Sequence, residues 1–199
     1  MDKKHTLSAL FSMEIRGEAA DARALAKRLG LRLEEARREI GQLKRAGMVK
    51  LVGGSARLTS RGRRAVRVVF IGGGFELIHY GHVYTISKAR SLGDHLVVSV
   101  ARDSTIRKRK NREPLVSEED RVRLLSSLRD VDAAILGVEG DIYVTLQKVK
   151  PDIVALGYDQ YHMEDEVMRE AKRRGMKLRV VRLDSPYPNI KTTRILKEL

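Results

Sequence analysis

The stretch GGGFELIHYGHVYTISKARSLGD, residues 72–94, decides the fold, and it directly follows the apolar run VRVVFI at residues 66–71. A short apolar run of this kind is typical of a parallel strand that is covered on both faces. The three glycines allow the backbone to turn and to approach a ligand closely. Residues 82–92 then carry a helical pattern. The segment therefore predicts a strand, a glycine-rich loop and a helix, in that order.

An anion-binding site is expected at this loop, because the free amides at the start of a helix attract negative charge. The glycine pattern matches neither GxGxxG with a downstream acid nor GxxxxGK[ST], which argues against a Rossmann dinucleotide site and against a P-loop. His79 and His82 offer another solution. They lie three residues apart across the turn at Tyr80 and Gly81, so both imidazoles can point to one side and donate hydrogen bonds to phosphoryl oxygens.

Two histidines at this spacing could also bind zinc, but the remaining sequence does not supply further ligands. His95 opens a predicted strand, His162 is remote in sequence, and the chain has no cysteine. We therefore expect no protein-bound metal ion. The lack of cysteine also excludes disulfides, thiolate sites and a cysteine nucleophile.

The rest of the C-terminal part alternates between short apolar runs and amphipathic segments. This alternation predicts an α/β fold, a doubly wound parallel sheet whose ligands bind at the carboxyl ends of the strands. The expected strands are residues 67–71, 95–101, 133–136, 153–156 and 178–182, and the expected helices are residues 82–92, 117–128, 141–149 and 165–175.

Residues 1–65 have a different pattern and are expected to form a separate domain, followed by a second domain at residues 66–199. Two helical segments joined at Gly30 are typical of a helix-turn-helix. A hairpin is expected around Gly53 and Gly54. The segment from Thr59 to Ala65 resembles the LTxxG start of the final helix in winged-helix regulators. A small winged-helix domain is therefore predicted in front of the α/β domain.

The net charge of +14 is concentrated in this first domain, where 16 Lys and Arg face 7 Asp and Glu. Such an excess indicates a polyanionic partner, and a winged helix makes DNA the expected one. A solvated basic face and a dimerisation module are the alternatives. A homodimer is also expected. The residues expected to contact DNA are Arg32, Arg37, Arg38 and Gln42 near and on the second helix of the motif, and Arg57 on the hairpin.

The segment from Gly72 to His82 resembles the GTFDxxHxGH signature of the nucleotidyltransferase superfamily, and residues 66–199 resemble its cytidylyltransferase-like branch. Further motifs follow in the same order: VARD at 100–103, RKRK at 107–110, EEDR at 118–121, LGYDQ at 156–160 and IKTTRI at 190–195. The chain departs from the pattern within the glycines, where the superfamily has Thr, at Glu76, where it has Asp, and at Lys191, where it has Ser.

The resemblance implies that a phosphate monoester attacks the α-phosphorus of a nucleoside triphosphate and that pyrophosphate leaves without an enzyme nucleophile. His79 and His82 would bind the α/β region, Lys108 or Lys110 would hold phosphates from a mobile basic loop, and Mg²⁺ would cover the remaining charge. Asp103 would orient the acceptor or cap a helix. The other implied ligand contacts are Gly73, Gly74, Phe75, Gly81, Arg121, Gly157, Tyr158, Asp159, Gln160, Thr192, Thr193 and Arg194.

The segment LGYDQ and the acidic residues after it resemble archaeal-type FAD synthetase, which implies ATP and FMN as substrates. Cytidylylation of glycerol phosphate or a similar head-group phosphate with CTP is an alternative, as is another adenylylation. A DNA-binding regulator that uses the fold as a nucleotide sensor is a further one. No window approaches the roughly 18 to 20 apolar residues of a membrane span. We therefore expect a cytoplasmic protein without a membrane partner.

Overall fold

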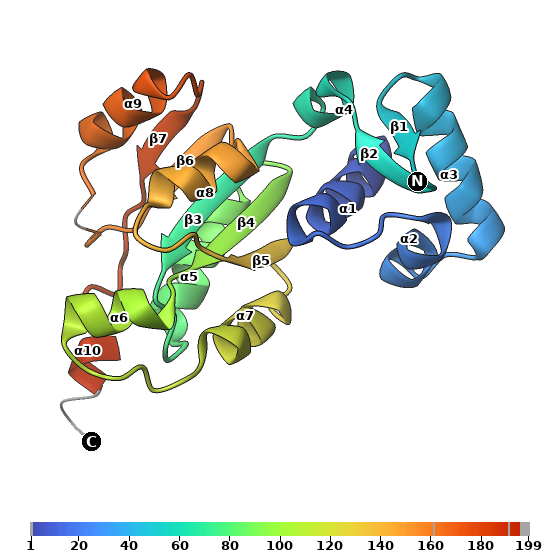
Figure 1. Cartoon of the computed structure of the whole chain (residues 1–199). Helices are drawn as coiled ribbons and strands as arrows, with labels where there is room; N and C mark the ends of the chain where they lie inside the picture. The colour runs from blue at the N-terminus through green and yellow to red at the C-terminus, as the bar shows by residue number, and fades with distance from the viewer. Residues whose placement is uncertain (1, 161, 191, 196–199) are drawn as a thin grey trace. The chain divides into compact units, whose positions relative to one another are not determined.

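The computed structural model describes residues 2–160, 162–190 and 192–195, with only the backbone of Thr193. The chain divides into two compact units, Met1–Arg67 and Val68–Leu199. Both units are drawn in Figure 1. The division lies two residues after the boundary expected from the sequence.

The first unit contains helices α1 (Lys3–Arg16), α2 (Ala22–Leu29) and α3 (Leu33–Arg45), strands β1 (Val49–Val52) and β2 (Ser55–Leu58), and helix α4 (Ser60–Arg64). Local chemistry sets the boundaries of these elements. Asp21 caps α2 by accepting from the Ala24 amide at 2.8 Å, and Gly30 ends it in the left-handed region. Gly53 and Gly54 have φ of 56° and 81°, which are the angles that a two-residue hairpin turn requires.

The second unit is built on a five-stranded sheet in which every strand pair is parallel. Its strands are β3 (Val68–Gly73), β4 (His95–Val100), β5 (Ala133–Leu136), β6 (Ile153–Leu156) and β7 (Arg179–Arg182). All five begin and end within two residues of the predicted positions. The predicted doubly wound α/β fold is therefore confirmed.

The strand order is β5-β4-β3-β6-β7, so the chain moves outward in one direction from β3 and returns on the other side with β6. The direction of winding reverses between β3 and β6. In an open parallel sheet this reversal leaves a crevice at the carboxyl ends of the two central strands, where ligands bind.

Two aspartates fix the amino ends of the central strands. The Asp152 carboxylate accepts from the Val68 amide at 2.7 Å, and its own amide donates to the Val68 carbonyl at 2.9 Å. Asp132 makes the same pair of bonds with Leu96, at 2.8 and 3.2 Å. Each aspartate directly precedes the next strand of the sheet, so these bonds set the register at the end opposite to the crevice.

The helices of the second unit are α5 (Tyr80–Arg90), α6 (Asp103–Lys110), α7 (Glu118–Ser126), α8 (Ile142–Val149), α9 (Glu164–Arg173) and α10 (Thr192–Ile195). Helix α6 corrects the sequence interpretation, because the basic run at residues 107–110 lies on a helix and not in a loop. The buried side chain of Ile106 anchors the helix, and Asn111 ends it with a φ of 49°. No helix among the described residues is long and apolar enough to cross a membrane.

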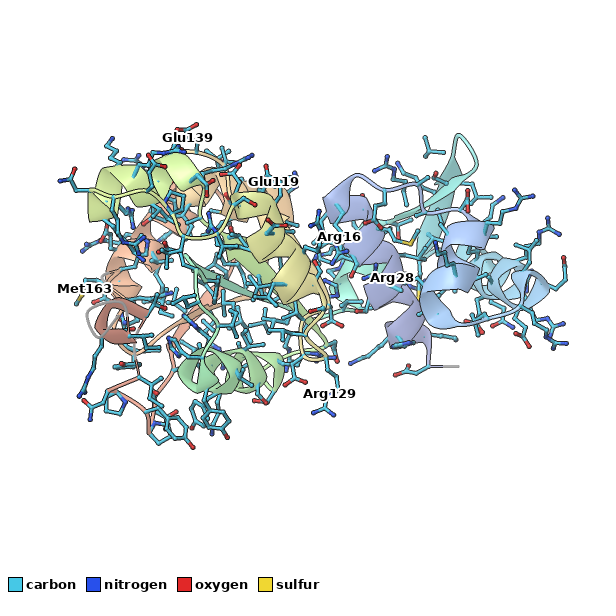
Figure 2. All side chains as sticks on the ribbon, turned by 90° about the horizontal axis from the view of Figure 1, so that it is seen from below. Arg16, Arg28, Glu119, Arg129, Glu139 and Met163 are labelled. Atoms are coloured by element: carbon cyan, nitrogen blue, oxygen red, sulfur yellow. The ribbon has the colours of Figure 1, made fainter. Side chains whose placement is uncertain are left out.

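Alternate residues of the strands face two different layers. One layer joins Val69, Ile71, Leu96 and Val98 to buried residues of α5 and α7. The neighbouring strand residues point to the opposite face, where α8 crosses in front of the strands in Figure 1. In the side-chain view of Figure 2, charged residues such as Glu119, Arg129 and Glu139 lie at the periphery of this unit. The sheet is therefore covered on both faces, as its continuously apolar strands require.

The core of the second unit can be tested at Leu125, which is completely buried on α7, while the adjacent Leu124 is 44% exposed. We expect Leu125→Ala to lower the free energy of unfolding by about 2–5 kcal/mol, because it removes buried methyl groups and leaves a cavity. Leu124→Ala is the matched control and should change it by less than about 1 kcal/mol. Urea denaturation followed by circular dichroism measures both, and equal losses would contradict the assigned packing.

Candidate nucleotide-binding site

A cavity of about 230 Å³ opens at the crevice between the carboxyl ends of β3 and β6. It is lined by the glycine segment (Gly72–Gly74), the start of α5, the β6 loop (Gly157–Gln160) and the segment before α10. The predicted ligand contacts that line this cavity are Gly73, Gly74, Phe75, His79, Gly81, His82, Gly157, Tyr158, Asp159, Gln160 and Thr192.

The two histidines lie together at the start of α5. His79 is the N-cap residue in extended conformation, and its carbonyl accepts from the His82 amide at 2.9 Å. The imidazole rings stack with their centroids 3.9 Å apart and their planes at 25°. His79 Nδ1 is buried and has no hydrogen-bond partner within the described part of the chain. A buried ring nitrogen of this kind beside a cavity is available to a ligand.

Gly81 separates the histidines because the space beside it is filled. A Cβ atom at this position would lie 3.1 Å from His79 Nδ1 and 3.3 Å from the Ile190 carbonyl oxygen. Phe75 supports the pair from the other side. Its backbone has a φ of 51°, and its ring lies 5.3 Å from the His82 ring and directly over Gly73, where a Cβ would be only 2.9 Å away. The HYGH spacing thus places both rings in one pocket.

The electrostatics of the site favour neutral imidazoles. Burial, and to a smaller extent the neighbouring His79, lower the pKa of His82 to about 4. Burial also lowers the pKa of His79, although Asp159 acts in the opposite direction. At neutral pH both rings are therefore uncharged, and each presents one N–H donor and one acceptor nitrogen.

The β6 loop is tied to its surroundings by side-chain hydrogen bonds. Gln160 Nε2 donates to the Gly72 carbonyl at 2.6 Å, which links the loop to the glycine segment. Tyr158 donates its hydroxyl to the Pro188 carbonyl at 2.8 Å. Thr192 Oγ1 donates to the Leu77 carbonyl at 3.3 Å and so fixes the start of α10. Segments more than 80 residues apart in sequence thus converge on one cavity.

Glu76 is an anchor for a pair of cations. Its side chain is fully buried and accepts from Lys110 Nζ at 2.5 Å and from the Arg112 guanidinium at 2.7 and 2.9 Å. Burial alone would raise the pKa of Glu76, but the hydrogen bonds from Arg112 and Lys110 lower it to about 2. The longer acid at this position reaches both cations. Lys110 Nζ also lies 3.9 Å from the position of a Cβ on Gly74, beside the cavity.

Arg121 does not line the cavity and is completely buried. Its guanidinium donates to the carbonyls of Gly74, Ala101 and Val116 at 2.6, 2.8 and 3.0 Å, and to the Asp103 carboxylate. The direct phosphate contact that the sequence suggested for Arg121 does not fit this arrangement, because its donors are bound within the protein. Arg121 and Asp103 instead hold the glycine segment beside the end of β4.

The other predicted phosphate ligands lie away from the cavity or outside the described residues. Lys108 and Arg194 are exposed and do not line it. The side chains of Thr193 and of Lys191 lie outside the described residues. The described residues also include no group of three or more His, Asp or Glu side chains that could hold a metal ion.

Three residues of this region were not found by sequence reasoning. Arg112 binds Glu76, Tyr187 lines the cavity, and Arg182 donates to the β6 loop. Arg112 and Arg182 stand among many other basic residues, and Tyr187 lies in an irregular segment. Only their position in the folded chain distinguishes them.

In the first unit, the residues expected to contact DNA are all exposed. Arg32 and Arg37 form ion pairs with Glu35 and Glu34, at 2.7 and 2.6 Å. The remaining residues of this expected set are Arg38 and Gln42 on α3 and Arg57 on β2. The guanidinium of Arg57 lies 3.9 Å from the Glu14 carboxylate.

Comparisons with known proteins show the family to which the chain belongs. A cytidylyltransferase-like family model matches residues 70–198. An FAD synthase from Aciduliprofundum boonei is 48% identical over 56% of this chain and 74% of that protein, and one from Thermococcus onnurineus is 40% identical over 71% and 96%. The crystal structure of a lipopolysaccharide core biosynthesis protein from Thermoplasma volcanium is 42% identical over 60% and 98%, with a TM-score of 0.58. The chain therefore belongs to the cytidylyltransferase-like family.

Proposed function

We propose that the chain is an FAD synthase, which transfers the AMP group of ATP to the phosphate of FMN and releases pyrophosphate. The observation that carries the proposal is the stacked pair of neutral histidines inside a cavity at the switch point of the sheet. The choice of ATP and FMN over CTP and a head-group phosphate rests on the relatives named FAD synthase, which are 40–48% identical.

The reaction requires position and charge rather than an enzyme nucleophile. An oxygen of the FMN phosphate attacks the α-phosphorus of ATP, and the bond between the α-phosphorus and the bridging oxygen breaks as pyrophosphate leaves. His79 and His82 donate hydrogen bonds to the α and β oxygens, where negative charge develops. A preorganised donor of this type contributes about 3–4 kcal/mol to the stabilisation of a transition state.

The surrounding residues have separate roles in this proposal. The β6 loop receives the adenine, and the start of α10 at Thr192 receives the β and γ phosphates. Lys110 and Arg112, which Glu76 holds beside the glycine segment, attract the phosphate of FMN. Mg²⁺ enters as a complex with ATP and neutralises part of the triphosphate charge.

Purified protein with Mg²⁺ should release pyrophosphate with ATP and FMN, and should not do so with CTP and glycerol 3-phosphate. His82→Asn should lower kcat by about 10²–10³, because it removes a donor to the reacting phosphates. A coupled pyrophosphate assay and chromatography of FAD measure both effects.

The control is His5→Asn, which changes an exposed histidine of the first unit and should keep the normal rate. Turnover with CTP alone would favour a cytidylyltransferase. Tight nucleotide binding without turnover would favour a nucleotide sensor, and a nearly normal rate for His82→Asn would contradict the role of the pair.

The titration of His82 is a second test. Without ligand its imidazole should titrate near pH 4, well below the ordinary value of 6.5. Bound ATP should raise this pKa, because negative phosphates stabilise the protonated ring. NMR of the imidazole protons across pH 3–8, with and without ATP, measures the change. An ordinary pKa that ATP leaves unchanged would show that the ring is neither buried nor beside the phosphates.

We also propose that the first unit is a winged-helix module that binds DNA. The observation that favours this second function is the exposed basic surface of α3 and β2, which includes Arg38, Gln42 and Arg57, in a unit that carries most of the net charge. Side chains on the second helix of such a motif reach the major groove, and the hairpin reaches the backbone. A homodimer would present two such helices to one duplex.

The double substitution Arg37→Ala and Arg38→Ala should weaken binding to duplex DNA and reduce its salt dependence, because up to two phosphate contacts are lost. Fluorescence anisotropy with a labelled duplex at several salt concentrations measures both. The matched control is Arg123→Ala with Arg129→Ala, two exposed arginines of the second unit. An equal loss in the control, or no binding by the wild type at low salt, would contradict the proposal.

A further inference from the structure

The β6 loop is held from behind by one side chain, Arg182, which is the last residue of β7. Its Nη1 donates to the carbonyls of Gly157 and Gln160, at 2.9 and 3.1 Å. Its Nη2 donates to the His162 carbonyl at 2.5 Å and to Glu164 at 2.8 Å, and Nε donates to Glu164 at 2.6 Å. A guanidinium has five N–H groups, so every donor of Arg182 has an acceptor.

Glu164, the first residue of α9, fixes the orientation of this guanidinium. Both of its carboxylate oxygens face Arg182 in a bidentate ion pair, and the hydrogen bond from Arg182 lowers the pKa of Glu164 to about 2. The side chains are only 27% and 33% exposed. A bidentate pair of this kind restricts the plane of the guanidinium, which leaves Nη1 and Nη2 directed at the loop carbonyls.

The β6 loop continues beyond the strand and has left the ladder of the sheet. The Gly157 carbonyl accepts from the Gln160 amide at 3.1 Å, and Arg182 adds a side-chain donor to this carbonyl and to that of Gln160. Arg182 supplies three bonds from one rigid, planar group, whereas a lysine has a single donor atom and cannot span the three carbonyls. Two residues of the loop that line the cavity supply further tethers, from Gln160 to the Gly72 carbonyl and from Tyr158 to the Pro188 carbonyl.

We infer that Arg182, oriented by Glu164, is a positioning residue that sets the place of the β6 loop and thereby the binding of the nucleotide. Arg182 does not line the cavity, so it acts through the loop and not by contact with the ligand. The inference rests on the proposed function only in naming ATP as the nucleotide. It separates the two substrates, because Arg182 binds the β6 loop, whereas the cations proposed to attract the phosphate of FMN are held by Glu76.

Arg182→Lys tests the inference, since it keeps the positive charge and removes the planar fork. The KM for ATP should rise by about tenfold or more, because displacement of a supporting group by about 1 Å has effects of this size. The KM for FMN should change less than about twofold. Arg179→Lys is the matched control on the same strand, where the side chain is exposed and the backbone amide donates to the Asp152 carbonyl at 2.9 Å.

Calorimetric titration with ATP and Mg²⁺ alone makes the test independent of FAD formation. If the wild type binds ATP and Arg182→Lys binds it about tenfold more weakly, the inference stands even when no FAD is formed and the proposed function fails. An unchanged dissociation constant, or an equal rise of KM for both substrates, would overturn the inference and leave the proposed function intact.

Glu164→Gln provides a second reading if Arg182→Lys does not fold. It keeps Arg182 in place but weakens its orientation, so ATP binding should weaken by a smaller factor, about threefold. Circular dichroism and thermal unfolding establish that the variant is folded. ATP binding by folded Glu164→Gln that equals the wild type would overturn the role given to the ion pair.

Discussion

Parallel strands end in carbonyl groups and loop amides that no neighbouring strand pairs, and a ligand site at this edge depends on how these groups are held. In the second unit, two arginines donate hydrogen bonds to such carbonyl groups. Arg121 binds the carbonyls of Gly74, Ala101 and Val116, and Arg182 binds those of the β6 loop. Each is oriented by one carboxylate. Two segments that line the cavity are thus supported by arginine side chains that do not line it themselves.

The histidine pair depends on this frame for its chemical state. The rings stack against each other, and the His82 ring lies at an angle of 57° to the Phe75 ring. Their partial burial favours the neutral form of both. A pair of imidazolium ions at 3.9 Å would repel each other strongly. Each neutral ring can instead donate an N–H hydrogen bond to a phosphate oxygen on which negative charge develops. The burial that lowers the pKa of His82 in the free protein therefore leaves both rings able to bind side by side to an anionic substrate.

The fold and the centre of the site could be predicted from sequence because both depend on local patterns. Buried parallel strands are continuously apolar, and the HYGH spacing fixes two rings on one turn of a helix. The supporting arginines could not be predicted, because their partners are carbonyls, and every residue carries a carbonyl. The family resemblance implies a phosphate contact for Arg121, whereas the folded chain directs its donors to three carbonyls. Helix α6 could not be predicted either, because Ile106 is its one buried residue and the basic run that follows shows no apolar periodicity.

The central claim is that groups from the glycine segment, α5 and the β6 loop form one nucleotide site. A crystal structure with Mg²⁺ and a non-hydrolysable ATP analogue tests it most directly. The account predicts an α-phosphate within hydrogen-bond distance of His79 and His82, with the base against residues 157–160. A nucleotide bound elsewhere, or phosphates directed away from both imidazoles, would contradict it.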